Sequence, residues 1–299
     1  MARVSHAASR HEVRWCFHAS ALVADYELTR DALAWLIGCR PLEDHSHDDP
    51  AIGRRGGMTW VGDNSIELGE PSVPGGETDR FVQRFGSHMS SVAVQIADSD
   101  GTVAFLEEHE APVAARIDGD ILFTSPKGTA GVVVEWFGGV PPNDPRFGAG
   151  IPAYSVQPLL EVTNMAFVGA VVAQPAHAAD RLAHLFGTAV TFVDDDAPLG
   201  QPRAGVSIRD LSLALFELPD AGASEELWGY RYRRPMASSL GVRVPDLATA
   251  FAALTTAGVP LVRRDERSIV VHPSATGGVL LVVVDELLPG DPRLDTNDV

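Results

Sequence analysis

The sequence has few cysteines and few basic residues, and it has no long apolar run. Cys16 and Cys39 are too few for a disulfide scaffold or a thiolate metal site, so we expect a reducing compartment. A total of 23 Lys and Arg against 40 Asp and Glu gives a net charge of −17, which argues against binding nucleic acid or a membrane. No apolar stretch reaches about 18 residues, and the start "MARVSHAASRHEVRW" lacks the apolar core of a signal peptide. The expected location is the cytoplasm.

Glycine and proline mark the expected domain boundary. The chain has 299 residues, of which 45% are hydrophobic, as in an ordinary globular protein of one large domain or two smaller ones. The stretch "PPNDPRFGAGIPAYSVQP" is rich in both residues and has no hydrophobic period, which is typical of a linker. We therefore expect a first domain at 1–140, a linker at 141–158 and a second domain at 159–299.

Internal repeats divide each expected domain in two. Residues 22–38, "LVADYELTRDALAWLIG", align with 171–187, "VVAQPAHAADRLAHLFG", and 92–113 align with 240–261 in the same way. Each segment reads as a strand end, a polar turn and an amphipathic helix, and strand candidates follow it. The sequence therefore predicts an α+β protein of four βαβββ modules, whose curved mixed sheets enclose a cleft.

A carboxylate inside an apolar strand suggests a metal site. Glu135 stands in "GVVVEWFG", where an unpaired charge would cost several kcal/mol. His18 and His88 lie in opening strands of the first two modules, and Glu67 and Glu135 lie in closing strands, 49 and 47 residues further on. If the modules superimpose, all four side chains meet at one point. Two imidazoles and two carboxylates suit one divalent ion, with Zn, Ni, Co, Fe(II) and Mn left open.

These motifs resemble those of the vicinal oxygen chelate superfamily, which includes glyoxalase I, methylmalonyl-CoA epimerase, extradiol dioxygenases and bleomycin-resistance proteins. The similar segments are "SIELGEP", "SHMSSVAVQIAD" and "FTSPKGTAGVVVEWF". The resemblance implies two tandem glyoxalase-like domains and a first-domain metal site made by His18, Glu67, His88 and Glu135. In the second domain the alignment places Phe167, Leu215, Met236 and Val282 at the matching positions, so we expect that domain to bind no metal.

The function expected from this resemblance is that of a metal-dependent isomerase, epimerase or lyase. Its substrate would be a small molecule with two neighbouring oxygens, whose enediolate the ion stabilises while Glu67 or Glu135 acts as general base. Two alternatives stay open: an Fe(II) or Mn(II) ring-cleaving dioxygenase, and a non-catalytic ligand-sequestering protein. We expect a small-molecule partner, no nucleic acid and no membrane, and we leave formation of a homodimer open.

Two further segments carry clustered polar residues. "EDHSHDDP" (43–50) contains His45 and His47, but adjacent ligand-type residues seldom share one ion, so a solvated loop is expected. "ELWGYRYRRPM" (226–236) interleaves arginine with aromatic residues, which favours a lid or interface segment in so acidic a chain. Its arginines, Arg231, Arg233 and Arg234, could bind an anionic group of a substrate.

Overall fold

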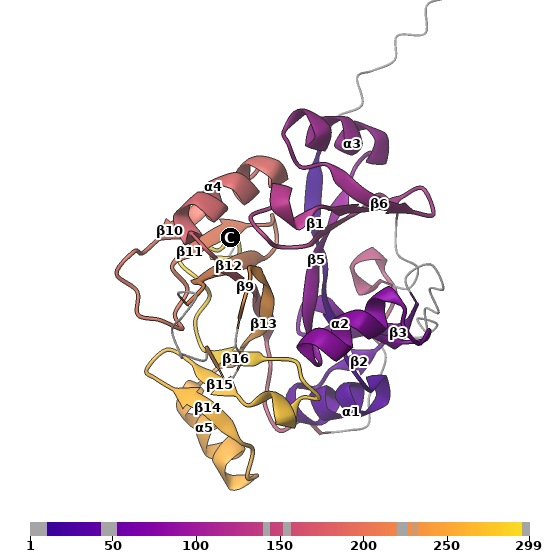
Figure 1. Cartoon of the computed structure of the whole chain (residues 1–299). Coiled ribbons are helices and arrows are strands. Elements are labelled where there is room, and N and C mark those ends of the chain that lie inside the picture. The colour runs from indigo at the N-terminus through magenta and orange to yellow at the C-terminus, as the bar shows by residue number, and fades with distance from the viewer. Residues whose placement is uncertain are drawn as a thin grey trace, which may run out of the picture.

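Two eight-stranded sheets of mixed direction, one in each half of the chain, form the framework of the protein (Figure 1). The structure is a computed structural model that describes residues 11–42, 53–139, 144–151, 157–219, 227, 228, 230 and 232–294. The first half contains β1 (Val13–Leu22), α1 (Tyr26–Ile37), β2 (Arg40–Pro41), β3 (Arg54–Val61), β4 (Asn64–Pro71), α2 (Glu77–Phe85), β5 (His88–Ile96), α3 (Ser99–Glu108), β6 (Val113–Ile117), β7 (Ile121–Thr124), η1 (Pro126–Gly128) and β8 (Val134–Phe137).

The second half repeats this order of elements. After η2 (Pro145–Phe147) come β9 (Asn164–Val172), α4 (Pro175–Phe186), β10 (Val190–Val193), β11 (Ala204–Ser207), β12 (Ser212–Glu217), β13 (Met236–Arg243), α5 (Leu247–Thr256), β14 (Leu261–Arg264), β15 (Ile269–Val271), η3 (Pro273–Ala275) and β16 (Leu281–Val284). The α+β class and the four βαβββ modules are therefore confirmed. Helix α2, with the sequence "ETDRFVQRF", is an addition between the first two modules that the sequence did not predict.

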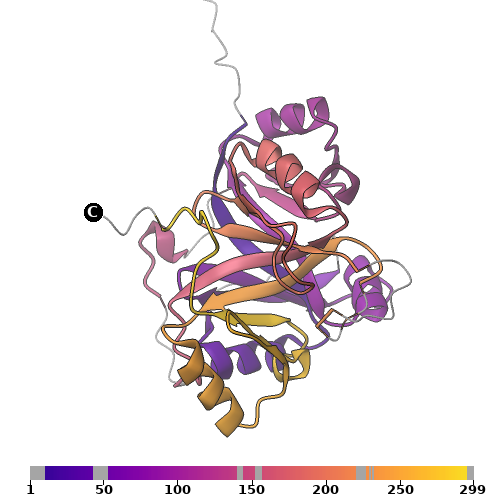
Figure 2. The ribbon, with the colours of Figure 1, turned by 90° about the vertical axis from the view of Figure 1, so that its left-hand side faces the viewer.

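The two sheets share one strand order, β2-β3-β4-β1-β5-β8-β7-β6 in the first half and β10-β11-β12-β9-β13-β16-β15-β14 in the second. In the first sheet the central strands β1 and β5 are antiparallel, and each has a parallel outer neighbour, β4 for β1 and β8 for β5. Such a sheet has a pseudo-twofold axis between β1 and β5. Strand β5 also packs beside β13, which joins the halves (Figures 1 and 2).

Local signals in the sequence set where the module helices begin and end. Asp25 precedes α1 and accepts a hydrogen bond from the backbone N–H of Leu28, and Asp98 caps α3 in the same way. Helix α1 ends at Gly38, whose left-handed backbone, with φ of 71°, suits a residue without a Cβ. These caps place each helix a fixed number of residues after its module's first strand.

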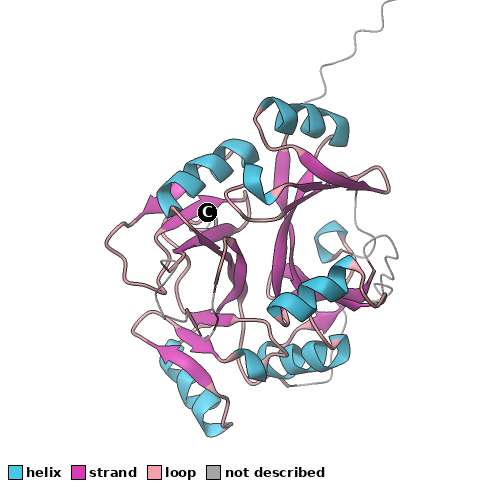
Figure 3. Cartoon of the chain, viewed as in Figure 1, coloured by secondary structure: helices cyan, strands magenta, loops and turns pink. Residues whose placement is uncertain are grey.

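Helices lie on the outside of the sheets (Figure 3), and the main apolar core lies between the helices and the sheets. Helix α1 contributes Leu33 and Leu36 to this core, and α4 contributes Leu182 and Phe186. Helices α3 and α4 lie side by side, one from each half (Figure 2). Among the helices of the described residues, none is long and apolar enough to cross a lipid bilayer.

Candidate metal centre

His18 lies at a β-bulge in the central strand of the first sheet. The pairing of β1 with β5 shifts between Cys16 and His18, so Phe17 is the extra residue. A bulge re-aims the side chains beside it. The imidazole of His18 packs edge-on against the ring of Phe17, and His18 is 2% exposed. Its direction is therefore fixed by backbone geometry and by a neighbouring aromatic ring.

The strand register brings two glutamates to the same face of the sheet as His18. Ala93 of β5 pairs with His18 on one side and with Glu135 of β8 on the other. Ser20, two residues after His18, pairs with Glu67 of β4. Paired residues in a sheet point to the same face. As a result Nε2 of His18 lies 3.5 Å from Oε2 of Glu67 and 3.8 Å from Oε1 of Glu135.

These three side chains have the geometry of an ion-binding group. One ligand atom from each lies within 4.8 Å of the other two, and the carboxylates are 6% and 4% exposed. Around a tetrahedral ion with bonds of about 2.1 Å, neighbouring donors lie about 3.4 Å apart. Neither ring nitrogen of His18 has a hydrogen-bond partner within the described part of the chain. One nitrogen and two carboxylate oxygens therefore fit a divalent ion such as Zn, Mn or Fe(II).

Arg54 adds a positive charge to this centre. Its Nη1 donates to Oε2 of Glu67 over 2.7 Å, and its side chain is largely buried. To reach Glu67, Arg54 crosses β4 at Gly69, where a Cβ would lie 2.4 Å from its Cδ. Glycine at that position thus makes room for the arginine stem. The guanidinium stabilises the ionised form of Glu67.

His88, the fourth ligand predicted from sequence, lies outside this group of three. Because Ser20 pairs with Glu67 and Ala93 pairs with Glu135, Ser20 and Ala93 are counterparts about the pseudo-twofold axis. Two residues earlier in β5 stands Ser91, which is therefore the counterpart of His18. The predicted equivalence of His18 and His88 is wrong, by three residues.

A signal in the sequence could have identified this counterpart. His18 and Ser91 each stand seven residues before the aspartate that caps the following helix (25 − 18 and 98 − 91). The predicted alignment used the spacing from histidine to glutamate, which crosses loops of different length. The spacing from strand to helix cap crosses one short turn and is conserved between the two modules of this chain.

His88 instead packs at the junction between the halves. Its Nδ1 is 2.9 Å from the carbonyl oxygen of Met89, and the rings of Tyr230 and Tyr232 meet it edge-on. Burial lowers the pKa of His88 below its ordinary value, although the hydrogen bond to Met89 opposes that effect. The side chain is therefore a neutral part of the packing between the first sheet and the rings of Tyr230 and Tyr232.

We expect His88 to make the protein less stable in acid. The pKa of His88 is lower in the folded state than in the unfolded state. As pH falls, the unfolded chain therefore takes up a proton first, and the free energy of unfolding decreases. The loss begins near the unfolded pKa of about 6.5 and continues down to the folded pKa. Urea unfolding at several pH values should show a shallower acid loss for His88→Gln than for the natural chain. Equal slopes would contradict this account.

Apolar and aromatic side chains wall the metal centre. They form one cluster on the same side of the first sheet: Phe17, Leu42, Met58, Trp60, Ala93 and Phe137. The rings of Phe17 and Phe137 stack with centroids 4.5 Å apart. A wall of this kind lowers the local dielectric constant and strengthens the electrostatic interactions of the carboxylates. It also favours a substrate with an apolar body.

A buried arginine holds the bulge that carries His18. Nη1 and Nη2 of Arg146, in η2, donate to the carbonyl oxygens of Cys16 and Phe17 over 2.7 and 2.9 Å. The same guanidinium is paired with the buried carboxylate of Asp144 at 2.6 Å. Asp210 of the second half accepts from the backbone N–H of Cys16 over 2.6 Å, and burial raises the pKa of Asp210 to about 6. Arg146 and Asp210 thus fix the backbone of Cys16 and Phe17, the two residues that precede His18.

The two hydrogen bonds from an arginine to the bulge, here called the clamp, recur in the second half, where the described residues form no metal-binding group. Arg293, within "DPRL", donates to the carbonyl oxygens of Met165 and Ala166 over 2.7 and 2.9 Å. Arg146, within "DPRF", belongs to the segment predicted as a linker, and Arg293 lies near the end of the second predicted domain. The sequence repeat was a signal for both contacts, and the two arginines are a matched pair for mutagenesis.

We expect Arg146→Gln to lower metal affinity about tenfold, because a loosened bulge no longer directs His18 at the carboxylates. Arg293→Gln should cost a similar amount of unfolding free energy and leave metal affinity unchanged. Chelator competition measures the affinity, and urea unfolding measures the stability. If the two variants had equal metal affinities, the clamp would have a structural role only.

Aromatic rings occupy the corresponding place in the second half. Phe167 lies where His18 lies in the first half, and its ring covers Gly241, where a Cβ would be 2.6 Å from Cδ1 of Phe167. Val282 pairs with Gly241 as Glu135 pairs with Ala93. Phe216 and Trp228 complete this apolar cluster. Phe167 and Val282 thus stand where the alignment placed them, and neither can bind an ion.

Two other positions in that alignment are wrong. Ala214, which pairs with Gly169, is the counterpart of Glu67, whereas the predicted Leu215 points to the opposite face and joins the main core. Ser239, seven residues before the capping Asp246 (246 − 239), replaces Met236 as the counterpart of Ser91. A slip of one residue moves a side chain to the other face of a sheet. Two other predictions, the loop at 43–50 and the candidate anion ligand Arg231, lie outside the described residues.

Comparison with solved structures identifies the fold. A mutant 4-hydroxymandelate synthase from Streptomyces coelicolor matches with a TM-score of 0.67 and 14% identity, covering 94% of this chain and 96% of that one. A Mn(II)-bound glyoxalase from Novosphingobium aromaticivorans matches with a TM-score of 0.59 and 11% identity, covering 95% and 85%. A xylose isomerase-like TIM barrel/4-hydroxyphenylpyruvate dioxygenase fusion protein matches with a TM-score of 0.58 and 11% identity, covering 93% and 50%.

At these identities the matches establish the fold and no specific activity. No protein-family model matches the chain, and no curated protein matches its sequence. The chain has a tandem glyoxalase-like fold, as the motifs in its first half predicted.

Proposed function

We propose that the protein is a divalent-metal-dependent enzyme of the vicinal oxygen chelate type, in which His18, Glu67 and Glu135 hold the ion. The observation that carries this proposal is the convergence of one imidazole and two carboxylates, buried and within 4.8 Å of one another. Burying two carboxylates beside a histidine is costly unless positive charge compensates them. Arg54 supplies one charge and a divalent ion would supply two.

The proposed reaction is proton transfer on a small substrate with two adjacent oxygens, as in an isomerase, epimerase or lyase. An ion at this centre would supply positive charge that polarises a substrate oxygen and acidifies the neighbouring C–H. Glu67 is bonded to Arg54, which makes it a weaker base. We therefore assign the proton transfer to Glu135, which takes the proton from carbon and returns it. His18 orients the group, and the aromatic wall excludes water.

A second candidate is a ring-cleaving or related dioxygenase with Fe(II) or Mn(II). Three protein ligands leave positions open for a substrate and for oxygen, and a structural neighbour is named as a dioxygenase fusion protein. The usual set for such chemistry is two histidines and one carboxylate. The group here has one histidine and two carboxylates, so we place this candidate second.

One experiment separates these candidates. The protein is purified without chelators and incubated with 2-hydroxyacetophenone, an aromatic α-hydroxy ketone, in D₂O. The proposal predicts metal-dependent loss of the C2 proton signals by NMR. Oxygen uptake with catechol or hydroquinone, without exchange, would favour the dioxygenase. Binding of the ketone with neither reaction would favour a sequestering protein.

A further inference from the structure

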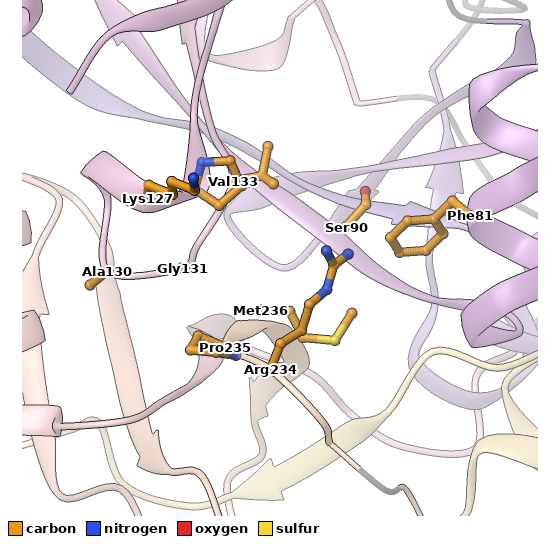
Figure 4. Close-up of a pocket in the computed structure, with 10 residues that line it drawn as sticks. Phe81, Ser90, Lys127, Ala130, Gly131, Val133, Arg234, Pro235 and Met236 are labelled. Atoms are coloured by element: carbon orange, nitrogen blue, oxygen red, sulfur yellow. The ribbon is translucent and has the colours of Figure 1, made fainter.

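A cavity of about 270 Å³ lies between the two halves (Figure 4). The first half lines it with α2, β5 and the turn from η1 to β8, and the second half lines it with the residues that lead into β13. Its lining residues are Phe81, Ser90, Pro126, Lys127, Ala130, Gly131, Val133, Arg234, Pro235 and Met236. Most of this surface is apolar, and its charged groups are both cations.

The two cations reach the cavity from different halves of the chain. Lys127 lies on η1, and Arg234 comes from the second half, pointing toward the strand that carries Ser90 (Figure 4). Within the described residues, neither is paired with a carboxylate. In a chain with a net charge of −17, two unneutralised cations at one cavity favour an anionic ligand.

Local structure packs the segments that carry the two cations against each other. Gly131 has φ of 91°, and a Cβ at this position would lie 2.1 Å from Cβ of Pro235. Glycine thus allows the segment before β13 to pack directly on the turn after η1. The guanidinium carbon of Arg234 lies 4.6 Å from the ring centroid of Phe85, which supports the side chain.

The cavity borders the metal centre along strand β8. Val133, which directly precedes β8, lines the cavity, and Glu135 stands two residues further along the chain, within β8. At about 3.3 Å per residue, these two positions are about 7 Å apart. Ser91, beside Ser90, pairs with Ser20, which in turn pairs with Glu67. The cavity and the metal centre are therefore neighbours along the first sheet.

We infer that this cavity binds the anionic end of the substrate, a carboxylate or phosphate on an apolar body, with Lys127 and Arg234 as its partners. The inference rests on the proposed function for the position of the reacting end, and it names the class of substrate. Phe81, Val133 and Met236 contact the apolar body. Arg234 binds the anion with a planar fork of donors and Lys127 with a point charge. The second half thus contributes a residue to a site whose metal ligands all belong to the first.

The test is calorimetric titration of the protein, as purified, with three probes. These are 3-phenylpropionate, phenyl phosphate and the neutral 3-phenylpropan-1-ol. Both anions should bind more tightly than the alcohol, and Lys127→Met and Arg234→Met should each weaken anion binding about tenfold. The preferred anion distinguishes a carboxylate from a phosphate substrate.

Arg84→Met is the matched control. Arg84 also lies over the ring of Phe85, at 5.2 Å, but it does not line the cavity. Its removal should leave anion binding unchanged. If anion affinity is the same in the natural chain, Lys127→Met and Arg234→Met, or if the alcohol binds as tightly as the anions, the inference is overturned.

Metal content measured in the same samples separates this inference from the proposed function. Charge-dependent binding in a protein that holds no ion would support the anion site and remove the metal-dependent reaction. A metal-loaded protein whose affinity for the anions is unaffected by Lys127→Met and Arg234→Met would keep that reaction and overturn the anion site.

Discussion

Replacing His18 with alanine is expected to lower the affinity for Mn²⁺ or Zn²⁺ by more than about 100-fold. His18 is the only nitrogen donor in the group that the described residues form, and both carboxylates approach its Nε2 within 3.8 Å. Without His18 only two carboxylate oxygens remain as ligands, and Arg54 already donates a hydrogen bond to one of these carboxylates. Competition with a fluorescent chelator measures the affinity, and circular dichroism shows whether the variant is folded.

His88→Gln is the matched control for this prediction. Both histidines are buried in the central strands of the first sheet, but only His18 belongs to the group of three. We expect the His88 variant to bind metal with natural affinity. A loss of affinity in His88→Gln comparable with that in His18→Ala would show that His88 is a ligand after all.

Glu135→Gln is expected to reduce deuterium exchange of 2-hydroxyacetophenone by about 1,000-fold, within the usual contribution of a general base. The amide has the shape of the carboxylate but accepts no proton. Its oxygen can still bind an ion weakly, so some metal should remain. The variant should fold as well as the natural chain when both lack metal, because a buried charge has been removed.

Glu217→Gln provides the control for the loss of a carboxylate. Glu217 lies on β12 in the second half and pairs with Arg203 at 3.0 Å, away from the metal centre. Its exchange rate should equal that of the natural chain. If Glu135→Gln retained the full rate, Glu135 would not be the base.

The fold was predictable because its signals are local and repeated. Each module has a strand, a helix and further strands, and segments 92–113 and 240–261 match where Asp98 and Asp246 cap their helices. The glutamates were predictable for a different reason, since a charge inside the apolar strand of Glu135 requires a partner. Both signals can be recognised from the amino-acid sequence alone.

The position of His88 outside the group could not be inferred from the spacing between histidine and glutamate. His18 and His88 both occur in first strands, but the bulge after Cys16 and another near Ser20 change which residues face the centre. Bulges are set by tertiary contacts, here Arg146 and Asp210 on the backbone of Cys16, which come from distant parts of the chain. The prediction of Leu215 was wrong by one residue, and one residue decides which face of a sheet a side chain occupies.

The cavity between the halves also lay beyond sequence reasoning. Arg234 was singled out as a candidate anion ligand, but Lys127 is distant in the chain, and only the packing of the two halves places both in the lining of one cavity. Composition predicted an acidic surface and said nothing about where positive charge would collect.

Elemental analysis of the protein purified without chelators tests the central claim most directly. The account predicts a single divalent transition-metal ion per chain, and its loss in the His18→Ala variant. Folded protein that contains no such ion and takes up none of Zn²⁺, Mn²⁺ or Fe²⁺ on reconstitution would contradict it.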